Sequence, residues 1–412
     1  RIMDKKFYSL KDFGLQTGKS ISAISCEFQK FIDQMQIFEH KSYWVTANSN
    51  IGSSMYIENE ASPVTAFISN DYLGMSQREE TKNAGIQAIY KYGTGACASQ
   101  AIGGYLDIHH TLERAIADFT GQEDAILFSS GFGSNTGLLR AILGPNDIAY
   151  IDSFIHTSAL SGLRGTNTKN IGHNNLEYLD MILKMDGGKY GTKVVIIDGV
   201  YSQDGDLSLL PEYIDVCHKH GCLLMMDDAH GIGVMGDNGR GTAEYYDCLG
   251  QVDIITGTCS KSLGCVGGFV AASKQLIQYL KYYADSNVFS AAMTPQVAAS
   301  VLKAIELIKE KPEIRRKLWE NVYYLRSRLM SEGFDFGNTQ SPIFPIMVRD
   351  NKKVYEISEE LQKRCIFASG IAYPAVRTKE ARIRVSLLST HEIWQLDHLV
   401  DSLKEIRKNI PF

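Results

Sequence analysis

Residues 193–231 read KVVIIDGVYSQDGDLSLLPEYIDVCHKHGCLLMMDDAHG, and this stretch decides the fold. It contains two short apolar runs, at residues 193–197 and 222–226, with an amphipathic segment at residues 211–220 between them. The apolar runs are continuous, as expected for strands that are covered on both faces. Two such strands joined by a helix predict parallel neighbours in one α/β sheet.

The same alternation extends in both directions along the chain. Further strands are predicted at residues 124–128, 147–151, 254–258 and 268–272, and further helices at residues 110–120 and 176–185. We therefore expect a large α/β domain with a mostly parallel sheet over residues 66–300. Ligands of such sheets bind beyond the carboxyl ends of the strands, so polar residues that follow strands are candidates for chemistry.

Two other regions flank this domain. Residues 1–65 are mixed and polar, with one helical stretch at residues 24–38, and we interpret them as an N-terminal arm or lid. Residues 301–412 contain charged helices, short strands and a last helix at residues 391–408. This pattern predicts a smaller C-terminal α+β domain.

Composition excludes several classes of protein. The 412 residues are 44% hydrophobic and 22% charged, which is ordinary for a globular protein. The net charge of -5, without a basic run interleaved with aromatics, argues against a nucleic-acid partner. No apolar stretch reaches the length of a membrane span, so no integral membrane segment is expected. Eight cysteines without a repeated spacing indicate free thiols in a reducing compartment, and we expect a cytoplasmic protein.

One candidate metal site occurs at residues 217–222, which read CHKHGC. So many potential ligands in so short a segment cannot all reach one tetrahedral zinc ion, and no second cluster supplies others. The segment is better interpreted as a helix that ends at Gly221 before the next strand. We therefore predict no metal site.

Residues 253–264 read DIITGTCSKSLG and place Lys261 just after an apolar strand. A lysine at the mouth of a buried sheet is poorly solvated, which lowers its pKa and favours the neutral, nucleophilic amine. Thr258 and Ser260 supply hydroxyls beside it that suit a phosphate. The other interpretation of this segment alone is a strand end with a solvated lysine.

Two further strand ends carry polar residues. Asp227 directly follows a buried strand, where an unpaired carboxylate would be costly, and His230 follows it closely. A protonated pyridine nitrogen is a fitting partner for Asp227. Residues 128–135, FSSGFGSN, form a glycine-bearing turn into a helix, whose N-terminal N–H groups can bind phosphate. An anion cradle, a buried acid and a lysine at strand ends can converge in one cleft of the sheet.

In these segments and others, the sequence resembles the α-oxoamine synthases, which are fold-type I pyridoxal-phosphate-dependent transferases. The resembling stretches lie in the family's order over roughly residues 65–395 and are SNDYLG (69–74), YGTG (92–95), FSSGF (128–132), DGVYSQDGD (198–206), DDAH (227–230), GTCSK (257–261) and RIR (382–384). The resemblance implies the same fold, a pyridoxal 5'-phosphate cofactor and a homodimer with shared active sites.

The resemblance also implies a catalytic role for four residues. Lys261 would hold the cofactor and then act as the acid–base group at the substrate's α-carbon. His156 would stack on the pyridine ring, Asp227 would pair with the ring nitrogen, and His230 would contact the ring's phenolic oxygen. Taken alone, His156 is equally well a satisfied histidine at a strand end.

Other residues would bind the phosphate and the substrate. The implied phosphate ligands are the backbone N–H groups of Gly131 and Phe132, the hydroxyls of Thr258 and Ser260, and Ser290 from the other subunit. Asn70, Ser202 and Arg384 would hold the amino acid's carboxylate, with Arg384 able to grip it in bidentate fashion. Taken alone, Arg384 could equally be a half-exposed arginine of a strand without a binding role. Ser290 alone gives almost no indication of function.

The implied reaction is a decarboxylative condensation of an amino acid with an acyl-CoA thioester, which gives an α-amino ketone, CoA and CO2. Residues 172–175, 292–295 and 341–346 look closest to bacterial serine palmitoyltransferases, so we expect serine, a long-chain acyl-CoA and a place in sphingolipid synthesis. Open alternatives are a cysteate acyltransferase, an 8-amino-7-oxononanoate synthase, a 2-amino-3-ketobutyrate CoA ligase, and a fold-type I aminotransferase or lyase. A non-catalytic partner subunit would be expected to lack the lysine.

Two positions depart from the family pattern. Gln100 stands where an arginine is usual, and Arg377 stands where proline is common. The loss of one cation and the gain of another near the site suggest an amino-acid substrate with an acidic side chain, such as cysteate. Serine outcompeting acidic amino acids by a wide margin would exclude this hypothesis.

Overall fold

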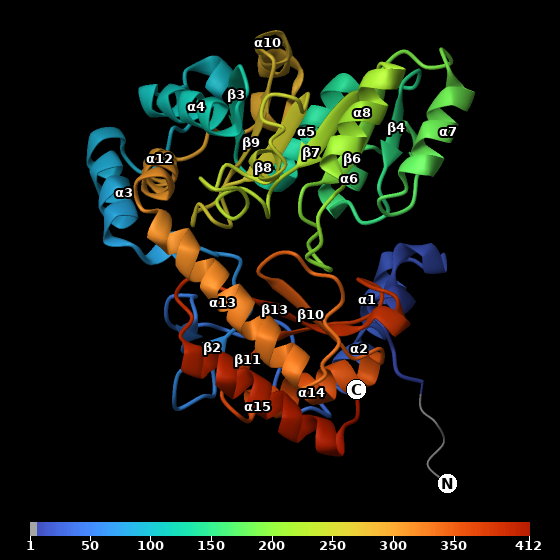
Figure 1. The fold of residues 1–412 in the computed structure, drawn as a ribbon, viewed down its shortest axis with the longest axis vertical. Coiled ribbons are helices and arrows are strands. Elements are labelled where there is room, and N and C mark those ends of the chain that lie inside the picture. The colour runs from blue at the N-terminus through green and yellow to red at the C-terminus, as the bar shows by residue number, and fades with distance from the viewer. Residues whose placement is uncertain (1–5) are drawn as a thin grey trace. The chain divides into compact units, whose positions relative to one another are not determined.

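The computed structural model describes residues 6–412 of the chain. They form two compact units: unit 1 is the chain up to Ser69 together with Trp319–Phe412, and unit 2 is Asn70–Leu318 (Figure 1). The sequence predicts boundaries near residues 65 and 300, whereas the second boundary of the structure lies within α13 (Pro312–Ser331). No helix in the described part of the chain is both long and apolar enough to cross a membrane.

Unit 2 is built on a seven-stranded sheet with strand order β3-β9-β8-β7-β6-β4-β5. The strands are β3 (Asp124–Phe128), β4 (Ile148–Ile151), β5 (Asn167–Asn170), β6 (Lys193–Asp198), β7 (Leu223–Asp227), β8 (Ile254–Thr258) and β9 (Gly268–Ala272). β9 is antiparallel to both of its neighbours, and the pairs from β8 across to β5 are parallel. The predicted α/β class with a mostly parallel sheet is therefore confirmed.

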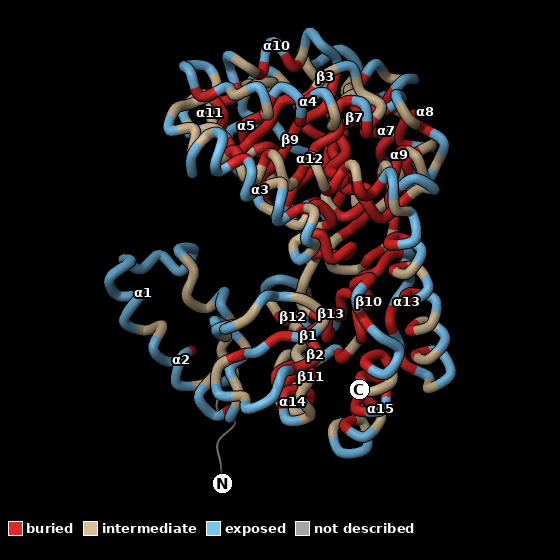
Figure 2. Tube along the Cα trace, turned by 90° about the vertical axis from the view of Figure 1, so that its left-hand side faces the viewer, coloured by how far each residue is buried: buried red, intermediate tan, exposed pale blue. Residues whose placement is uncertain are grey.

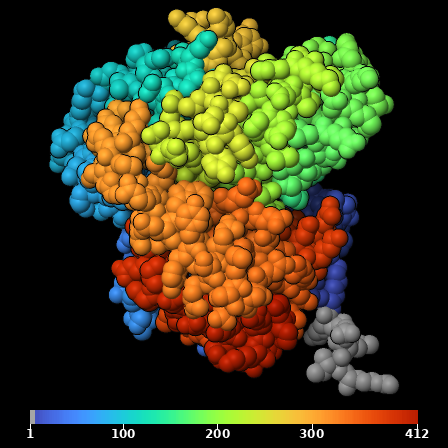
Figure 3. All heavy atoms as spheres, in the orientation of Figure 1, coloured from blue at the N-terminus to red at the C-terminus, as the bar shows by residue number. Residues whose placement is uncertain are grey.

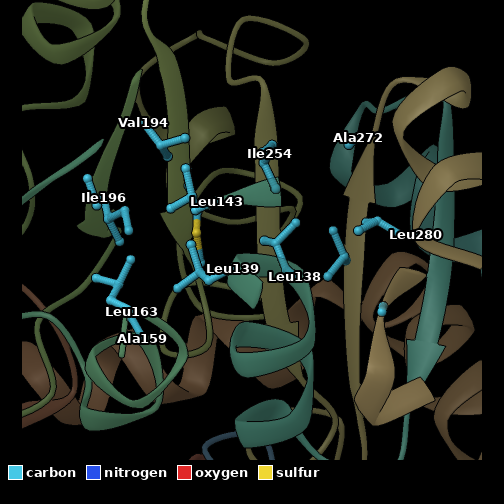
Figure 4. Packing of buried hydrophobic residues seen from close by; sticks show 14 of the residues in the cluster. Leu138, Leu139, Leu143, Ala159, Leu163, Val194, Ile196, Ile254, Ala272 and Leu280 are labelled. Atoms are coloured by element: carbon cyan, nitrogen blue, oxygen red, sulfur yellow. The ribbon is translucent and has the colours of Figure 1, made fainter. Parts of the chain in front are cut away.

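Helices cover both faces of this sheet. One face packs against α5 (Gly131–Ile142), α6 (Thr157–Gly162) and α10 (Lys274–Tyr283), and the other against α7 (Leu176–Asp186) and α8 (Leu210–His220). Side chains of β6 alternate between the two layers: Val194 and Ile196 join the first cluster, and Val195 and Ile197 join the second. Figure 4 shows the first cluster filling the space between α5 and the strands, and Figure 2 shows β3, β7 and β9 as mostly buried.

Helix ends in unit 2 agree with the sequence. α8 ends at Gly221, whose φ of 61° is the left-handed conformation that glycine adopts at little cost. α4 (Asp107–Thr120) begins three residues before the predicted start at residue 110. β5 was not predicted, because it reads Asn-Thr-Lys-Asn and is mostly exposed, so it carries no apolar signal.

Unit 1 contains two three-stranded sheets. One is antiparallel and comprises β10 (Ile343–Met347), β13 (Arg382–Ser386) and β12 (Ser369–Ile371). The other joins the two ends of the chain, because β2 (Val64–Ala66) pairs with β1 (Ser54–Met55) on one side and with β11 (Ile366–Phe367) on the other. Figure 3 shows blue N-terminal atoms beside red C-terminal atoms in this unit.

The N-terminal segment thus belongs to the same compact unit as the C-terminal one. Its helical stretch is divided into α1 (Ile21–Glu27) and α2 (Gln29–Met35). The hydroxyl of Tyr43 lies 2.7 Å from that of Tyr355 on α14 (Asn351–Gln362), which joins residues 312 positions apart. α15 (Ile393–Asn409) completes the unit close to the predicted helix at residues 391–408.

Candidate active site

A cavity of about 310 Å³ lies within unit 2, and Lys261 is part of its wall. Its lining comes from segments that follow β3, β4, β6, β7 and β8, which are the carboxyl ends of the parallel strands. The lining residues include the predicted Gly131, Phe132, His156, Ser202, Asp227, His230, Thr258, Ser260 and Lys261. Residues that are far apart in the sequence therefore converge where ligands of such sheets bind.

The anion cradle combines the start of α5 with the end of β8. Ser130 caps α5, and its Oγ accepts a hydrogen bond from the N–H of Gly133 at 2.9 Å. A Cβ atom at Gly131 would lie 2.8 Å from Cβ of Thr258, so glycine permits the helix start to approach β8 this closely. The hydroxyls of Thr258 and Ser260 are 2.7 Å apart. The start of α5 and the hydroxyls of Thr258 and Ser260 thus line one cavity, and N–H groups at a helix start together with hydroxyls suit a phosphate.

Asp227 is the last residue of β7 and is buried. Its Oδ2 accepts a hydrogen bond from Nδ2 of Asn135 at 2.7 Å, and its Oδ1 accepts one from the N–H of Ala229 at 3.0 Å. Its partner across the β6–β7 pair is Asp198, which also lines the cavity. Burial, followed by the nearby charge of Asp227, raises the pKa of Asp198 well above its usual range.

His230 is held by a tyrosine that the sequence analysis did not single out. The hydroxyl of Tyr72 lies 2.8 Å from Nδ1 of His230, and both side chains are buried. The same hydroxyl lies 3.4 Å from Oδ1 of Asn70, so Asn70 is connected to His230 through Tyr72. Tyr72 belongs to the SNDYLG stretch, which was the available signal for it.

His156 follows β4 and caps the short helix α6. Its Nδ1 lies 2.7 Å from Oγ of Ser158 and accepts the N–H of Ser158 at 3.3 Å. Burial lowers the pKa of His156, while the charges of Asp227 and Lys261 act on it in opposite directions. The shift favours the neutral imidazole, which suits a ring that stacks on an aromatic ligand.

Three of the predicted site residues, Ser290, Asn70 and Arg384, are not among the residues that line this cavity in the described part of the chain. Oγ of Ser290 is 3.5 Å from Oγ of Ser129, beside the exposed Phe289. Asn70 is connected through Tyr72 to His230, which does line the cavity. Arg384 is a buried residue of β13 in unit 1, where its Nη1 donates to Oγ of Ser386 at 2.8 Å.

The structure places Gln100 in a different part of unit 2. Its Oε1 accepts a hydrogen bond from Nδ2 of Asn287 at 2.5 Å, and its Nε2 lies 3.5 Å from Oε1 of Glu113. These residues line a separate cavity of about 180 Å³, together with Tyr105 and Lys281. The missing arginine therefore concerns the buried Glu113 rather than the wall of the cavity around Lys261.

The cavity fits pyridoxal 5'-phosphate. The cradle formed by α5, Thr258 and Ser260 suits the phosphate, and the buried carboxylate of Asp227 suits a protonated ring nitrogen. Lys261 provides the amine that such a cofactor needs. The cavity lining thus offers a partner for each polar group of the cofactor.

Comparisons with known proteins agree with this geometry. The family model for class I and II aminotransferases matches residues 62–403. A serine palmitoyltransferase of Sphingobacterium spiritivorum is 40% identical over 347 residues, which cover 84% of this chain and 87% of that protein. An 8-amino-7-oxononanoate synthase of Thermoanaerobacter pseudethanolicus is 37% identical over 344 residues, covering 83% and 87%.

The solved structures include a serine palmitoyltransferase of S. paucimobilis with a bound pyridoxal phosphate–myriocin adduct. It is similar to this chain with a TM-score of 0.89 at 26% identity, covering 98% of this chain and 99% of that one. This likeness extends over both units of the fold, and the sequence relatives span the segments on which the resemblance was based. The chain belongs to the class I and II aminotransferase family and, within it, to the pyridoxal-phosphate-dependent α-oxoamine synthases.

Proposed function

We propose that this chain condenses serine with a long-chain acyl-CoA thioester and releases CoA and CO2, in the manner of a serine palmitoyltransferase. The observation that carries the proposal is the convergence of Lys261, Asp227 and the phosphate cradle in one cavity of a chain that is 40% identical to a serine palmitoyltransferase. The product would be an α-amino ketone of the kind from which sphingoid lipids are made.

The cofactor, when bound, acts as an electron sink for the amino acid's α-carbon. The chain's own residues prepare the site for that chemistry. Lys261 would remove and return the α-proton through its amine. The first turn of α5, Thr258 and Ser260 would fix the phosphate, and the neutral imidazole of His156 would cover one ring face. Asp227 would stabilise a proton on the ring nitrogen. The roles of Asn70, Ser202 and Arg384 toward the substrate's carboxylate remain predictions.

The second candidate is an 8-amino-7-oxononanoate synthase, which condenses an amino acid with a shorter, acidic acyl thioester. The 37% identity to such an enzyme over 83% of the chain supports it. The hypothesis of an acidic amino-acid substrate loses one of its two supports, because Gln100 faces Glu113 in a different cavity. A cysteate acyltransferase and a 2-amino-3-ketobutyrate CoA ligase remain alternatives with less support.

A CoA-release assay on the purified holoenzyme tests the choice of substrate. Serine, glycine, alanine and cysteate are each paired with short, long and acidic acyl thioesters, and thiol release is followed with the visible absorbance. We expect release with serine and a long acyl chain. Release with alanine and an acidic acyl chain would assign the oxononanoate synthase instead. A yellow protein that releases thiol with no pair would exclude every synthase on this panel.

We also propose a cytoplasmic homodimer in which Ser290 serves the partner's phosphate site. Phe289, next to Ser290, is 89% exposed, and Tyr282 and Val266 are exposed as well, so these apolar side chains are candidates for coverage by a partner subunit. All eight cysteines, which lie in the described part of the chain, are free thiols, as in a reducing compartment.

Mixed dimers provide a sharp test of the shared site. Lys261→Ala and Ser290→Asp subunits should each be inactive alone, because one lacks the amine and the other places a charge against the phosphate. If Ser290 acts across the interface, random reassociation gives hybrid dimers with one intact site, and about a quarter of the wild-type activity returns. If Ser290 acts within its own subunit, both sites of the hybrid remain defective and no activity returns.

A further inference from the structure

Asn135 lies in the first half of α5, one helical turn after the phosphate cradle, and lines the cavity around Lys261. It is 2% exposed. Because its side chain is shielded from bulk water, the contacts that it makes in the cavity wall define what it does.

The amide nitrogen of Asn135 uses both of its hydrogens. Nδ2 donates to Oδ2 of Asp227 at 2.7 Å and to Oγ of Ser158 at 2.8 Å. The carboxylate of Asp227 can only accept, so the amide nitrogen rather than the amide oxygen must face it. The orientation of this amide is therefore fixed by chemistry.

The hydrogen bonds continue from Ser158 to His156. Because Oγ of Ser158 accepts from Asn135, its own hydrogen is available to Nδ1 of His156 at 2.7 Å. The backbone N–H of Ser158 points to the same Nδ1 at 3.3 Å. Two donors facing Nδ1 require that it carries no proton, which places the proton of the neutral ring on Nε2.

We infer that Asn135 is a positioning residue that fixes the carboxylate of Asp227 and, through Ser158, both the orientation and the tautomer of His156. The inference rests on pyridoxal phosphate binding at this site and does not depend on which substrate the proposed function assigns. Asp227 and His156 come from different elements, β7 and the start of α6, and Asn135 of α5 joins them.

These hydrogen bonds explain why an asparagine stands at position 135. An amide is the small side chain that can donate two hydrogens from one atom, whereas a hydroxyl can donate only one. Oδ1 of Asn135 is buried and has no hydrogen-bond partner among residues 6–412. A buried oxygen without a partner costs stability, so the side chain is better explained by the groups that it orients than by a contribution to folding.

The test uses Asn135→Ala, Ser158→Ala and the double variant. The first readout is the imidazole 15N spectrum of the cofactor-free protein, with the His156 signals assigned by their loss in His156→Asn. In the wild type we expect an unprotonated Nδ1 and a protonated Nε2. Either single substitution should shift the Nδ1 resonance toward that of a mixed tautomer population, and Asn135→Ala should add little in the Ser158→Ala background.

The second readout is the dissociation constant of pyridoxal phosphate. Asn135→Ala should raise it at least tenfold because Asp227 loses its donor, whereas Ser158→Ala should raise it by threefold or less. Unchanged His156 resonances and a dissociation constant within twofold of the wild type in Asn135→Ala would overturn the inference. Ser158→Ala removes a single oxygen atom, so its effect on the His156 spectrum decides the matter if Asn135→Ala does not fold. CoA release plays no part in either readout, so failure here is distinguishable from failure of the proposed function.

Discussion

The hydroxyl of Tyr72 lies 2.8 Å from Nδ1 of His230, and the contact joins residues 158 positions apart. Both side chains are buried, so the hydrogen bond is shielded from water and holds the imidazole in one orientation at the cavity wall. His230 is the residue expected to contact the phenolic oxygen of the cofactor. Because Tyr72 binds Nδ1 of His230, that contact would involve Nε2.

Tyr72→Phe should weaken this support without creating a cavity. Loss of the hydrogen bond leaves a buried imidazole nitrogen without that partner, which should lower the free energy of unfolding by about 1 kcal/mol. We expect kcat to fall roughly tenfold while the KM for the amino acid changes less. Tyr245→Phe, at an exposed position, is the matched control. Equal kinetics of Tyr72→Phe and wild type would show that the orientation of His230 does not need Tyr72.

Gly131→Ala should damage the phosphate cradle. The new Cβ would lie 2.8 Å from Cβ and 3.0 Å from Oγ1 of Thr258, so α5 or β8 must shift. We expect the dissociation constant of pyridoxal phosphate, measured by fluorescence titration, to rise at least tenfold, since about 1.4 kcal/mol of lost binding has that effect. Gly188→Ala, where an added Cβ meets nothing within 4 Å, should bind as the wild type does.

His173 should make the free energy of unfolding fall as the pH rises above neutrality. It lies 3.0 Å from Oδ1 of Asp152 and 2.7 Å from Oδ2 of Asp206. Burial opposes its charge, but the hydrogen bonds to both carboxylates outweigh burial and raise the pKa of His173 to about 10. Because the folded pKa exceeds the unfolded value of about 6.5, this stabilisation is complete below pH 6.5 and is lost as the pH rises to 10.

Urea unfolding at several pH values measures this effect. Between pH 7 and pH 9 the free energy of unfolding should fall by roughly 2 kcal/mol, and most of that fall should be missing in His173→Asn. The variant should be less stable than the wild type at pH 7. A wild type and a His173→Asn variant with parallel pH profiles would contradict a charged His173.

Glu113 gives a second decline of stability with rising pH, at lower pH than that of His173, because it is a buried acid. Burial raises the pKa of Glu113 to about 7, although Tyr105 donates to Oε2 at 2.5 Å. The folded protein then holds a proton that the unfolded chain releases near pH 4.5, so stability falls as the pH rises from 4.5 to 7.

Glu113→Gln should remove this decline and be more stable than the wild type at pH 8 by about 2 kcal/mol. Gln100→Arg should act in the same direction, because it replaces an amide that lies 3.5 Å from the carboxylate with a cation, which should lower the pKa of Glu113. Thermal unfolding at pH 5 and pH 8 checks both variants. A Gln100→Arg protein that is destabilised at pH 8 would show that this cavity cannot accept the guanidinium.

Much of this site could be predicted because its signals are local. Lys261, Asp227 and the turn at residues 128–132 each follow an apolar run, and the ordering of strand ends in a parallel sheet brings them together. Asn135 and Ser158 were not predicted, because their function depends on which side chains meet across elements, and periodicity carries no information about that. The N-terminal segment was predicted as an arm because β1 and β2 are too short to show a pattern, and they become a sheet only by pairing with β11.

The polar composition of β5 has a consequence for the behaviour of the protein in solution. β5 is the last strand in the order of the large sheet, so one of its sides presents backbone groups that another chain could extend. Its residues are Asn-Thr-Lys-Asn, and Lys169 is anchored 2.7 Å from Asp186. A charged, polar strand at this position discourages edge-to-edge aggregation. Apolar substitutions at Asn167 or Lys169 should therefore reduce the solubility of the protein more than its activity.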